Sequence, residues 1–295
     1  MSEACDLSNP VKSVLEYLKV IQHLRNAWNL RNSDEMWFRG EPHEYQTSLR
    51  PALYRPSAPF SRLKSLESVI YQEYQQFRLF QHEAEQFREK ASYQLDKDWD
   101  DYFLMQHHGA PTRLLDWTVL PLVALYFALQ TTDQSCSPRV YVLEWDRMQD
   151  KLKDSVAEDK HLRDWQKHIT EDRCTQYNWN EWEMAYLPME DTVRNKLPMP
   201  KMPLILEYDH YSRRINAQGS RFVIFGTEVD SLALELKRNS QDRAIEQILI
   251  DESSIDAISD ELANYGTTPV LIFPDLDGVG KLIKDNWKRW NKSDY

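Results

Sequence analysis

The segment at residues 102–128, YFLMQHHGAPTRLLDWTVLPLVALYFA, constrains the fold more than any other part of the chain. It begins with apolar residues at helical spacing and breaks at a glycine and a proline. Polar side chains then gather within twelve positions: His107, His108, Thr112, Arg113, Asp116 and Thr118. The next residues, VLPLVALYFAL, are among the least polar in the chain, which predicts a helix buried on most sides. Because buried charge is costly unless it is paired or used, Arg113 and Asp116 form either a structural ion pair or part of a functional site.

Before this segment the pattern predicts mostly helix. Residues 10–30 have apolar groups at helical spacing, with Ser8 or Asn9 as the cap and Pro10 at the first position. MWFRGEP, from Met36, predicts a short aromatic strand that ends in a turn. A long helix is expected over residues 63–91. A second helix is expected from Asp98 into QHHG, with Gly109 as its C-cap.

After this segment short strands alternate with turns and helices. We expect a helix at residues 119–130 and strands in RVYVLEW, LILEYD, RRINAQGSRFVIFG, AIEQILID and TPVLIF (residues 268–273). Residues 256–265 are expected to be helical, and PDLDG (residues 274–278) to open a final amphipathic helix. Residues 146–202 predict an irregular insertion with one or two helices. The whole chain, residues 1–295, therefore predicts a single mixed α+β domain with short strands and a helical N-terminal portion.

Charge and cysteine content limit the function. The net charge of -11 argues against a protein that binds long nucleic acids, although arginines near residues 50–62 and 213–221 could line a small basic pocket. The three widely spaced cysteines predict neither a disulfide framework nor a metal site. No signal peptide and no apolar run of membrane-spanning length is present, so we expect a cytoplasmic protein with no membrane partner.

Three motifs carry candidate chemistry. In WFRG, Arg39 ends an aromatic strand and Gly40 lies at a turn, so the guanidinium is expected at a sheet edge, available to a phosphate or paired with Glu41 or Asp116. In QHHGAPTRLLDWT, His107 or His108 is either a general base or a structural residue; no metal-ligand spacing and no good nucleophile accompanies them. In RRINAQGSRF, Gln218 could orient a substrate.

WFRG, QHHGAPTRLLDWT, LVALYFAL, AQGSRF and FPDLDG, in this order over about residues 30–285, resemble the FRG domain. That family is named for a Phe-Arg-Gly motif and occurs mainly in bacteria and their phages. The long middle block is the most specific part of the resemblance.

A second resemblance is to ADP-ribosyltransferases. Arg39-Gly40 is similar to their early Arg-Gly strand end, and LLDWTVLPLVALYFA to their Ser- or Thr-containing strand before a helix, with Thr118 in the hydroxyl position. This resemblance implies NAD as substrate and no metal, with the pyrophosphate on Arg39 and nicotinamide stacked on Trp37, Trp117 or Tyr126. The family's late catalytic Glu has no clear counterpart. Gln218 occupies its place, and the candidate carboxylates are Glu181, Glu183, Glu228 and Asp116.

The leading hypothesis is an NAD-using ADP-ribosyltransferase-like enzyme or NAD glycohydrolase, acting as a toxin or antiphage effector on a protein or nucleic-acid acceptor. The alternatives are a non-catalytic nucleotide- or protein-binding module, and a nuclease or phosphoesterase with a His base and Arg39 and Arg113 as phosphate clamp. The predicted catalytic residues are Arg39, His107, His108, Asp116 and Thr118. The predicted substrate-binding residues are Trp37, Gly40, Thr112, Arg113, Trp117, Arg214, Gln218 and Gly219.

Overall fold

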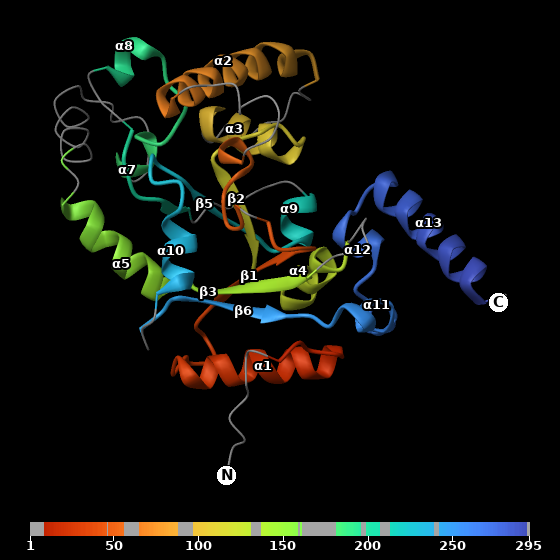
Figure 1. Cartoon of the computed structure of the whole chain (residues 1–295). Coiled ribbons are helices and arrows are strands. Elements are labelled where there is room, and N and C mark those ends of the chain that lie inside the picture. The colour runs from red at the N-terminus through yellow and green to blue at the C-terminus, as the bar shows by residue number, and fades with distance from the viewer. Residues whose placement is uncertain are drawn as a thin grey trace.

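A six-stranded antiparallel sheet organises the molecule (Figure 1). The computed structural model describes residues 9–45, 47–55, 65–87, 97–130, 137–158, 160, 181–195, 199–206, 213–238 and 242–293. The strands are β1 (Met36–Glu41), β2 (Leu114–Thr118), β3 (Arg139–Glu144), β4 (Leu204–Leu206), β5 (Ser220–Ile224) and β6 (Ile245–Leu249). Their order across the sheet is β4-β5-β2-β1-β3-β6.

The sheet is nearly split in its middle. β1 and β3 are in register from Met36 with Glu144 to Glu41 with Arg139, and β2 and β5 are in register along their full length. Between β1 and β2 the only paired position is Phe38 opposite Thr118. Two three-stranded halves therefore meet at one point, and their central strands diverge beyond it.

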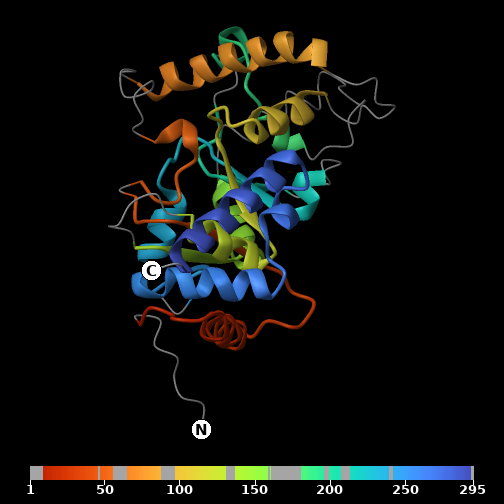
Figure 2. The ribbon, with the colours of Figure 1, turned by 90° about the vertical axis from the view of Figure 1, so that its right-hand side faces the viewer.

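Helices cover both faces of the sheet (Figures 1 and 2). Their bounds are α1 (Val14–Ala27), α2 (Leu66–Ala84), α3 (Lys97–His107), α4 (Pro121–Ala128), α5 (Trp145–Glu158), α7 (Glu181–Met184), α8 (Asp191–Arg194), α9 (Arg213–Ala217), α10 (Ser231–Lys237), α11 (Ile255–Asn264), α12 (Pro269–Ile272) and α13 (Leu276–Ser293). Short 3₁₀ turns are η1 (Ala52–Tyr54), η2 (Glu85–Phe87) and η3 (Glu252–Ser254).

The core has three parts because strand side chains alternate between faces. Phe38, Val140 and Val142 pack with α1, α4 and α11 on one face. Trp37, Tyr141 and their neighbours pack with η1, α5 and α10 on the other. A third cluster joins α2 and α3 to β2, β4 and β5. A single antiparallel sheet covered by helices confirms the predicted α+β class.

The central segment folds largely as its pattern predicts. α3 ends at His107, and Gly109 follows with φ +81°, as expected of a helix C-cap. LLDWT forms β2 and runs into α4, whose Val123, Ala124, Leu125 and Ala128 are buried. The predicted strands at WFRG and RVYVLEW and the helix near residues 256–265 are also confirmed.

Several local predictions were wrong. α1 begins after Ser13, whose hydroxyl accepts a hydrogen bond from the Glu16 amide; the predicted cap Ser8 lies outside the described residues. TPVLIF is a helical turn, α12, because Thr268 caps it and Pro269 occupies its first position. RRINA is helix α9, and only SRFVI forms a strand. The described parts of residues 146–202 hold three helices, α5, α7 and α8.

Candidate functional site

Where β1 and β2 diverge, the Arg39 side chain spans the gap between them. Its Nη1 donates a hydrogen bond of 2.8 Å to the Asp116 carbonyl oxygen, and its Nε donates one of 3.1 Å to Glu41 Oε1. Because β1 lies between β2 and β3, the prediction that Arg39 projects from a sheet edge was wrong. The guanidinium instead holds together the two halves of the split sheet, and its side chain keeps 15% of its surface exposed.

Asp116 places a carboxylate at the same gap. Its side chain is exposed, and Oδ2 accepts a 2.7 Å hydrogen bond from Gln106 Nε2. Gln106 is held in turn by the Thr112 hydroxyl, which donates to Oε1 at 2.5 Å. Desolvation by the surrounding protein raises the pKa of the Asp116 carboxyl, although Arg39 and the Gln106 hydrogen bond act to lower it. An exposed carboxyl with a raised pKa beside two arginines is a candidate functional group.

Two further charged residues, Glu41 and Arg55, lie at this gap; the sequence indicated Arg55 only as one of the arginines near residues 50–62 that could line a small basic pocket. The Glu41 carboxylate is buried, and its Oε2 has no hydrogen-bond partner among the described residues. Arg55 Nη2 lies 4.0 Å from Glu41 Oε1, and its guanidinium lies 5.5 Å from the centroid of the Tyr45 ring. Desolvation, and then the charge of Arg39, lower the pKa of Arg55. We call Arg39, Glu41, Arg55, Gln106 and Asp116 the wedge.

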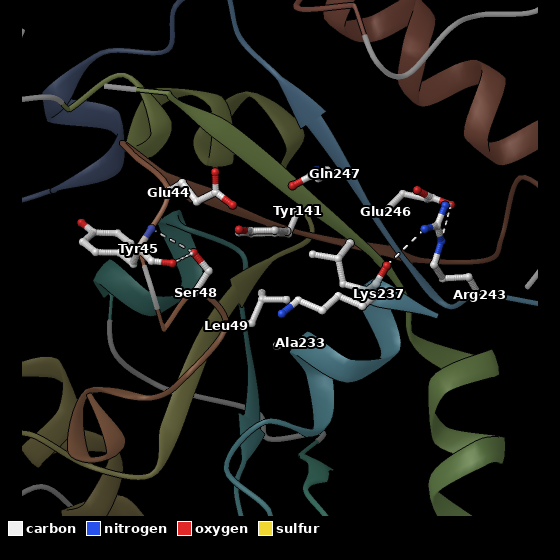
Figure 3. Close-up of a pocket in the computed structure, with 11 residues that line it drawn as sticks. Glu44, Tyr45, Ser48, Leu49, Tyr141, Ala233, Lys237, Arg243, Glu246 and Gln247 are labelled. Atoms are coloured by element: carbon white, nitrogen blue, oxygen red, sulfur yellow. Dashed lines mark hydrogen bonds and ion pairs between the residues drawn. The ribbon is translucent and has the colours of Figure 1, made fainter. Parts of the chain in front are cut away.

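Figure 3 shows a cavity of about 650 Å³ that is lined in part by Tyr45. Tyr45 links this cavity to the wedge, because its ring contacts Arg55 and also lines the cavity. Tyr141, the β3 partner of Arg39, lies at the centre of the cavity lining, with Gln247 of β6 beyond it. The other lining residues are Glu44, Ser48, Leu49, Ala233, Leu236, Lys237, Arg243 and Glu246. A cavity of this size and mixed polarity accommodates a small organic ligand.

Arg113 belongs to the core and not to the wedge. Its side chain has no exposed surface, and Nε lies 2.6 Å from Oε2 of the equally buried Glu73. Nη1 donates to the Phe225 carbonyl oxygen at 2.9 Å, and Nη2 donates to that of Tyr186. The predicted pair of Arg113 with Asp116 was therefore wrong, because Arg113 pairs with Glu73 and the Asp116 carboxylate bonds to Gln106. A substrate-binding role for Arg113 has no geometric support.

Thr118, Gln218 and Gly219 join β2 and α4 to β5. The Thr118 hydroxyl donates to the Gln218 carbonyl oxygen at 2.5 Å and accepts from the Leu120 amide at 2.9 Å. The side-chain Nε2 of Gln218 donates a hydrogen bond of 3.2 Å to the Ile272 carbonyl oxygen. Gly219 has φ +53°, and a Cβ there would lie 3.0 Å from Leu120 Cγ. These contacts hold the chain where β2 enters α4.

The predicted aromatic platform is mostly interior. Trp37 is 1% exposed and stacks on Trp145 at a centroid distance of 5.9 Å, while Trp117 is 2% exposed. Gly40 lies inside β1 and not at a turn, so that prediction was wrong; a Cβ there would lie 1.9 Å from the Ala124 carbonyl oxygen. Gly40 therefore permits the close approach of α4 to the sheet, and it does not line the wedge.

His107 is the last residue of α3, and His108 follows it. The charged groups that act on His107 are not those of the wedge. His107 is half-buried, and desolvation, Arg214 and His108 lower its pKa while Asp275 opposes them. The Arg214 guanidinium lies 4.5 Å from the centroid of the Phe273 ring. Since Arg113 is buried, a phosphate clamp of Arg39 and Arg113 beside a histidine base is not formed.

The other predicted carboxylates do not join the wedge. Glu183 is buried on α7, Glu228 is exposed after β5, and the side chain of Glu181 lies outside the described residues. Glu41 was considered in the sequence only as an ion-pair partner. It follows Arg39 by two positions in a strand, a spacing that places both side chains on one face.

The fold and the wedge define an α+β protein with a split antiparallel sheet and a charged site at the split. The family model of the FRG domain matches residues 34–137, so the chain contains an FRG domain. All five wedge residues lie within this match, whereas AQGSRF and FPDLDG lie beyond it, and the extension of the domain to residue 285 stays a prediction. Neither a curated protein nor a solved structure matches the chain. Among the described helices, none has the length and apolar character needed to cross a membrane.

Proposed function

We propose that the wedge binds the pyrophosphate of NAD and that the chain cleaves the bond between nicotinamide and ribose. Two neighbouring arginines suit a pyrophosphate, because planar guanidinium groups match phosphate oxygens in pairs. Arg39 Nη2 has no acceptor among the described residues, and the Arg55 side chain is 29% exposed. The observation that carries the proposal is the exposed Asp116 carboxylate, which is held by Gln106 and lies within the field of both arginines.

Asp116 supplies the carboxylate that the sequence resemblance lacked. As the C1′–N bond breaks, its electron pair leaves with neutral nicotinamide and positive charge develops on the ribose. A nearby desolvated carboxylate stabilises that charge more strongly than a hydrated one does. Water, or a hydroxyl or amine of a protein or nucleic-acid acceptor, then adds at C1′ and loses a proton. In a bacterial cytoplasm such consumption of NAD, or modification of an acceptor, would serve a toxin or antiphage effector.

Nicotinamide release from NAD tests this proposal. Purified wild-type protein is compared with Asp116→Asn and with Asp191→Asn, a matched change of an exposed carboxylate on α8. We expect Asp116→Asn to lower the rate about 10²-fold or more, as loss of a transition-state electrostatic contact does, and Asp191→Asn to have no effect. Equal rates in wild type and Asp116→Asn would reject the assigned role.

A binding module without catalysis is the second candidate, and one observation favours it. The Arg39 and Thr118 side chains both already make hydrogen bonds within the protein, so part of the predicted machinery has a structural use. In that case NAD or ADP-ribose would bind at the wedge and no nicotinamide would appear. Calorimetric binding without turnover would select this candidate over the enzyme.

A further inference from the structure

The C-terminal helix α13 turns its apolar side away from the protein. Leu276, Val279, Ile283, Trp287 and Trp290 have exposed fractions of 86%, 41%, 53%, 57% and 58%. At 3.6 residues per turn these five positions fall within an arc of about 80° and form one stripe along the helix. The Trp287 and Trp290 rings meet edge to face at a centroid distance of 5.3 Å. We call these five residues the α13 stripe.

The side of α13 that faces the body carries Gly278, Lys281, Leu282 and Asp285, so it is less apolar than the stripe. Gly278 is buried, and a Cβ there would lie 1.9 Å from the Phe273 carbonyl oxygen, so the base of the helix packs closely on the end of α12. Lys281 and Asp285 are half-buried, and Lys281 Nζ lies 5.0 Å from the centroid of the Tyr126 ring. Figures 1 and 2 show α13 outermost on this side of the molecule. An amphipathic helix normally buries its apolar side, so an outward stripe of this size indicates a binding surface.

The charge of α13 indicates what the stripe binds. The helix carries Lys281, Lys284, Lys288, Arg289 and Lys292 against Asp277 and Asp285, a net charge of +3 in a chain of net charge -11. Pairing of α13 with α13 of a second copy would bring two such positive helices together. Asn286 also occupies a position that is usually apolar in a coiled-coil seam, where it would weaken such a pairing. An anionic surface is the complementary partner.

We propose that α13 binds the surface of a membrane that contains anionic lipids. Tryptophan on the apolar side and lysine on the polar side are the composition of helices that lie in the lipid interface. Indole rings favour the headgroup region because they are apolar with one polar edge, and the exposed Lys284 lies beside the stripe, where it can reach the phosphates. The helix lies in the membrane plane and does not span the bilayer. This interaction is independent of the wedge.

Co-sedimentation of the full chain with vesicles tests the proposal. Vesicles of phosphatidylcholine alone are compared with vesicles that also contain phosphatidylserine, for wild type, for Trp287→Ser/Trp290→Ser, and for Tyr265→Ser. Tyr265 is a 65% exposed aromatic residue after α11 and serves as the matched control. We expect wild type and Tyr265→Ser to bind the phosphatidylserine vesicles, more weakly as salt is raised, and the double variant to bind at least about tenfold less.

Three outcomes would overturn the proposal. The first is that wild type binds neither kind of vesicle. The second is that the double variant binds phosphatidylserine vesicles as wild type does. The third is that wild type forms a dimer that the double variant does not form, seen by light scattering without lipid, which would assign the stripe to a second copy of the chain. Because both tryptophans are exposed, their replacement is not expected to unfold the protein, and circular dichroism of each variant checks this.

Discussion

At the scale of single residues, the wedge places two arginines and two carboxylates close together, and both arginines lie near the same oxygen of Glu41. Glu41 is shared between Arg39 and Arg55, and one of its oxygens has no partner among the described residues. Asp116 lies beside the same arginines, and its carboxylate accepts a hydrogen bond from Gln106. Groups held in such an incompletely satisfied arrangement cost stability, and proteins retain them mainly where a ligand completes the set.

The raised pKa of Asp116 has a consequence for stability. A carboxyl whose pKa is higher in the folded state binds its proton more tightly there than in the unfolded chain. Its contribution to stability is therefore present at low pH and is lost as pH rises through the folded-state pKa. We expect Asp116→Asn, which cannot ionise, to be more stable than wild type at neutral pH. The difference should shrink as the pH falls towards about 4, the ordinary pKa of an aspartate.

Thermal unfolding of both proteins across this pH range measures the effect. An Asp116→Asn protein that is less stable than wild type at neutral pH would mean that the carboxylate is a stabilising partner of Arg39. Together with the nicotinamide assay, a gain in stability with a loss of turnover would identify a residue retained for function.

At the scale of elements, glycine positions decide how closely α4 approaches the sheet. Replacement of Gly40 by alanine would place Cβ 1.9 Å from the Ala124 carbonyl oxygen and 2.6 Å from the Ala128 amide nitrogen. Both are backbone atoms of α4, so the helix itself would have to move. We expect a loss of about 3 kcal/mol or more in the free energy of unfolding, at the upper end of overpacking costs.

Gly109→Ala is the matched comparison. Its Cβ would have open space around it, and only the positive φ of +81° opposes it, so a loss of about 1–2 kcal/mol is expected. Urea denaturation of both variants gives the two values. Equal losses would show that α4 does not pack against Gly40 as the structure describes.

The same elements show what could be predicted from the sequence. The strand at WFRG, the strand–helix unit LLDWTVLPLVALYFA and the cap at Gly109 follow from local pattern and turn chemistry, and the structure has all three. The partner of Arg113 could not be found in this way, because Glu73 lies 40 positions away on α2 and only the fold brings them together. Thr268 and Pro269 did carry a helix-start signal, which the β-branched residues around them obscured.

At the scale of the whole molecule, the split sheet explains why the site lies where it does. A continuous sheet would pair the backbone groups of β1 and β2 beyond Phe38, whereas here Arg39 bonds to the Asp116 carbonyl oxygen in their place. The arginines and carboxylates of the wedge meet at this divergence. The sequence pattern contains the residue types of this site, but it does not show that they lie together. Arg55 follows η1, whereas Gln106 belongs to α3, and only the fold brings the two residues to the same place.

The central claim is that the wedge binds a nucleotide, and calorimetric titration with ADP-ribose tests it most directly. ADP-ribose has both phosphates of NAD but no bond to cleave, so the titration separates binding from turnover. We expect wild type to bind and Arg55→Gln to bind about tenfold or more weakly, because a charge-assisted contact is lost. Arg31→Gln, which removes an exposed arginine that pairs with Asp34 outside the wedge, should bind as wild type does. Absence of binding by wild type, or equal binding by Arg55→Gln, would contradict the assignment of the wedge as a nucleotide site.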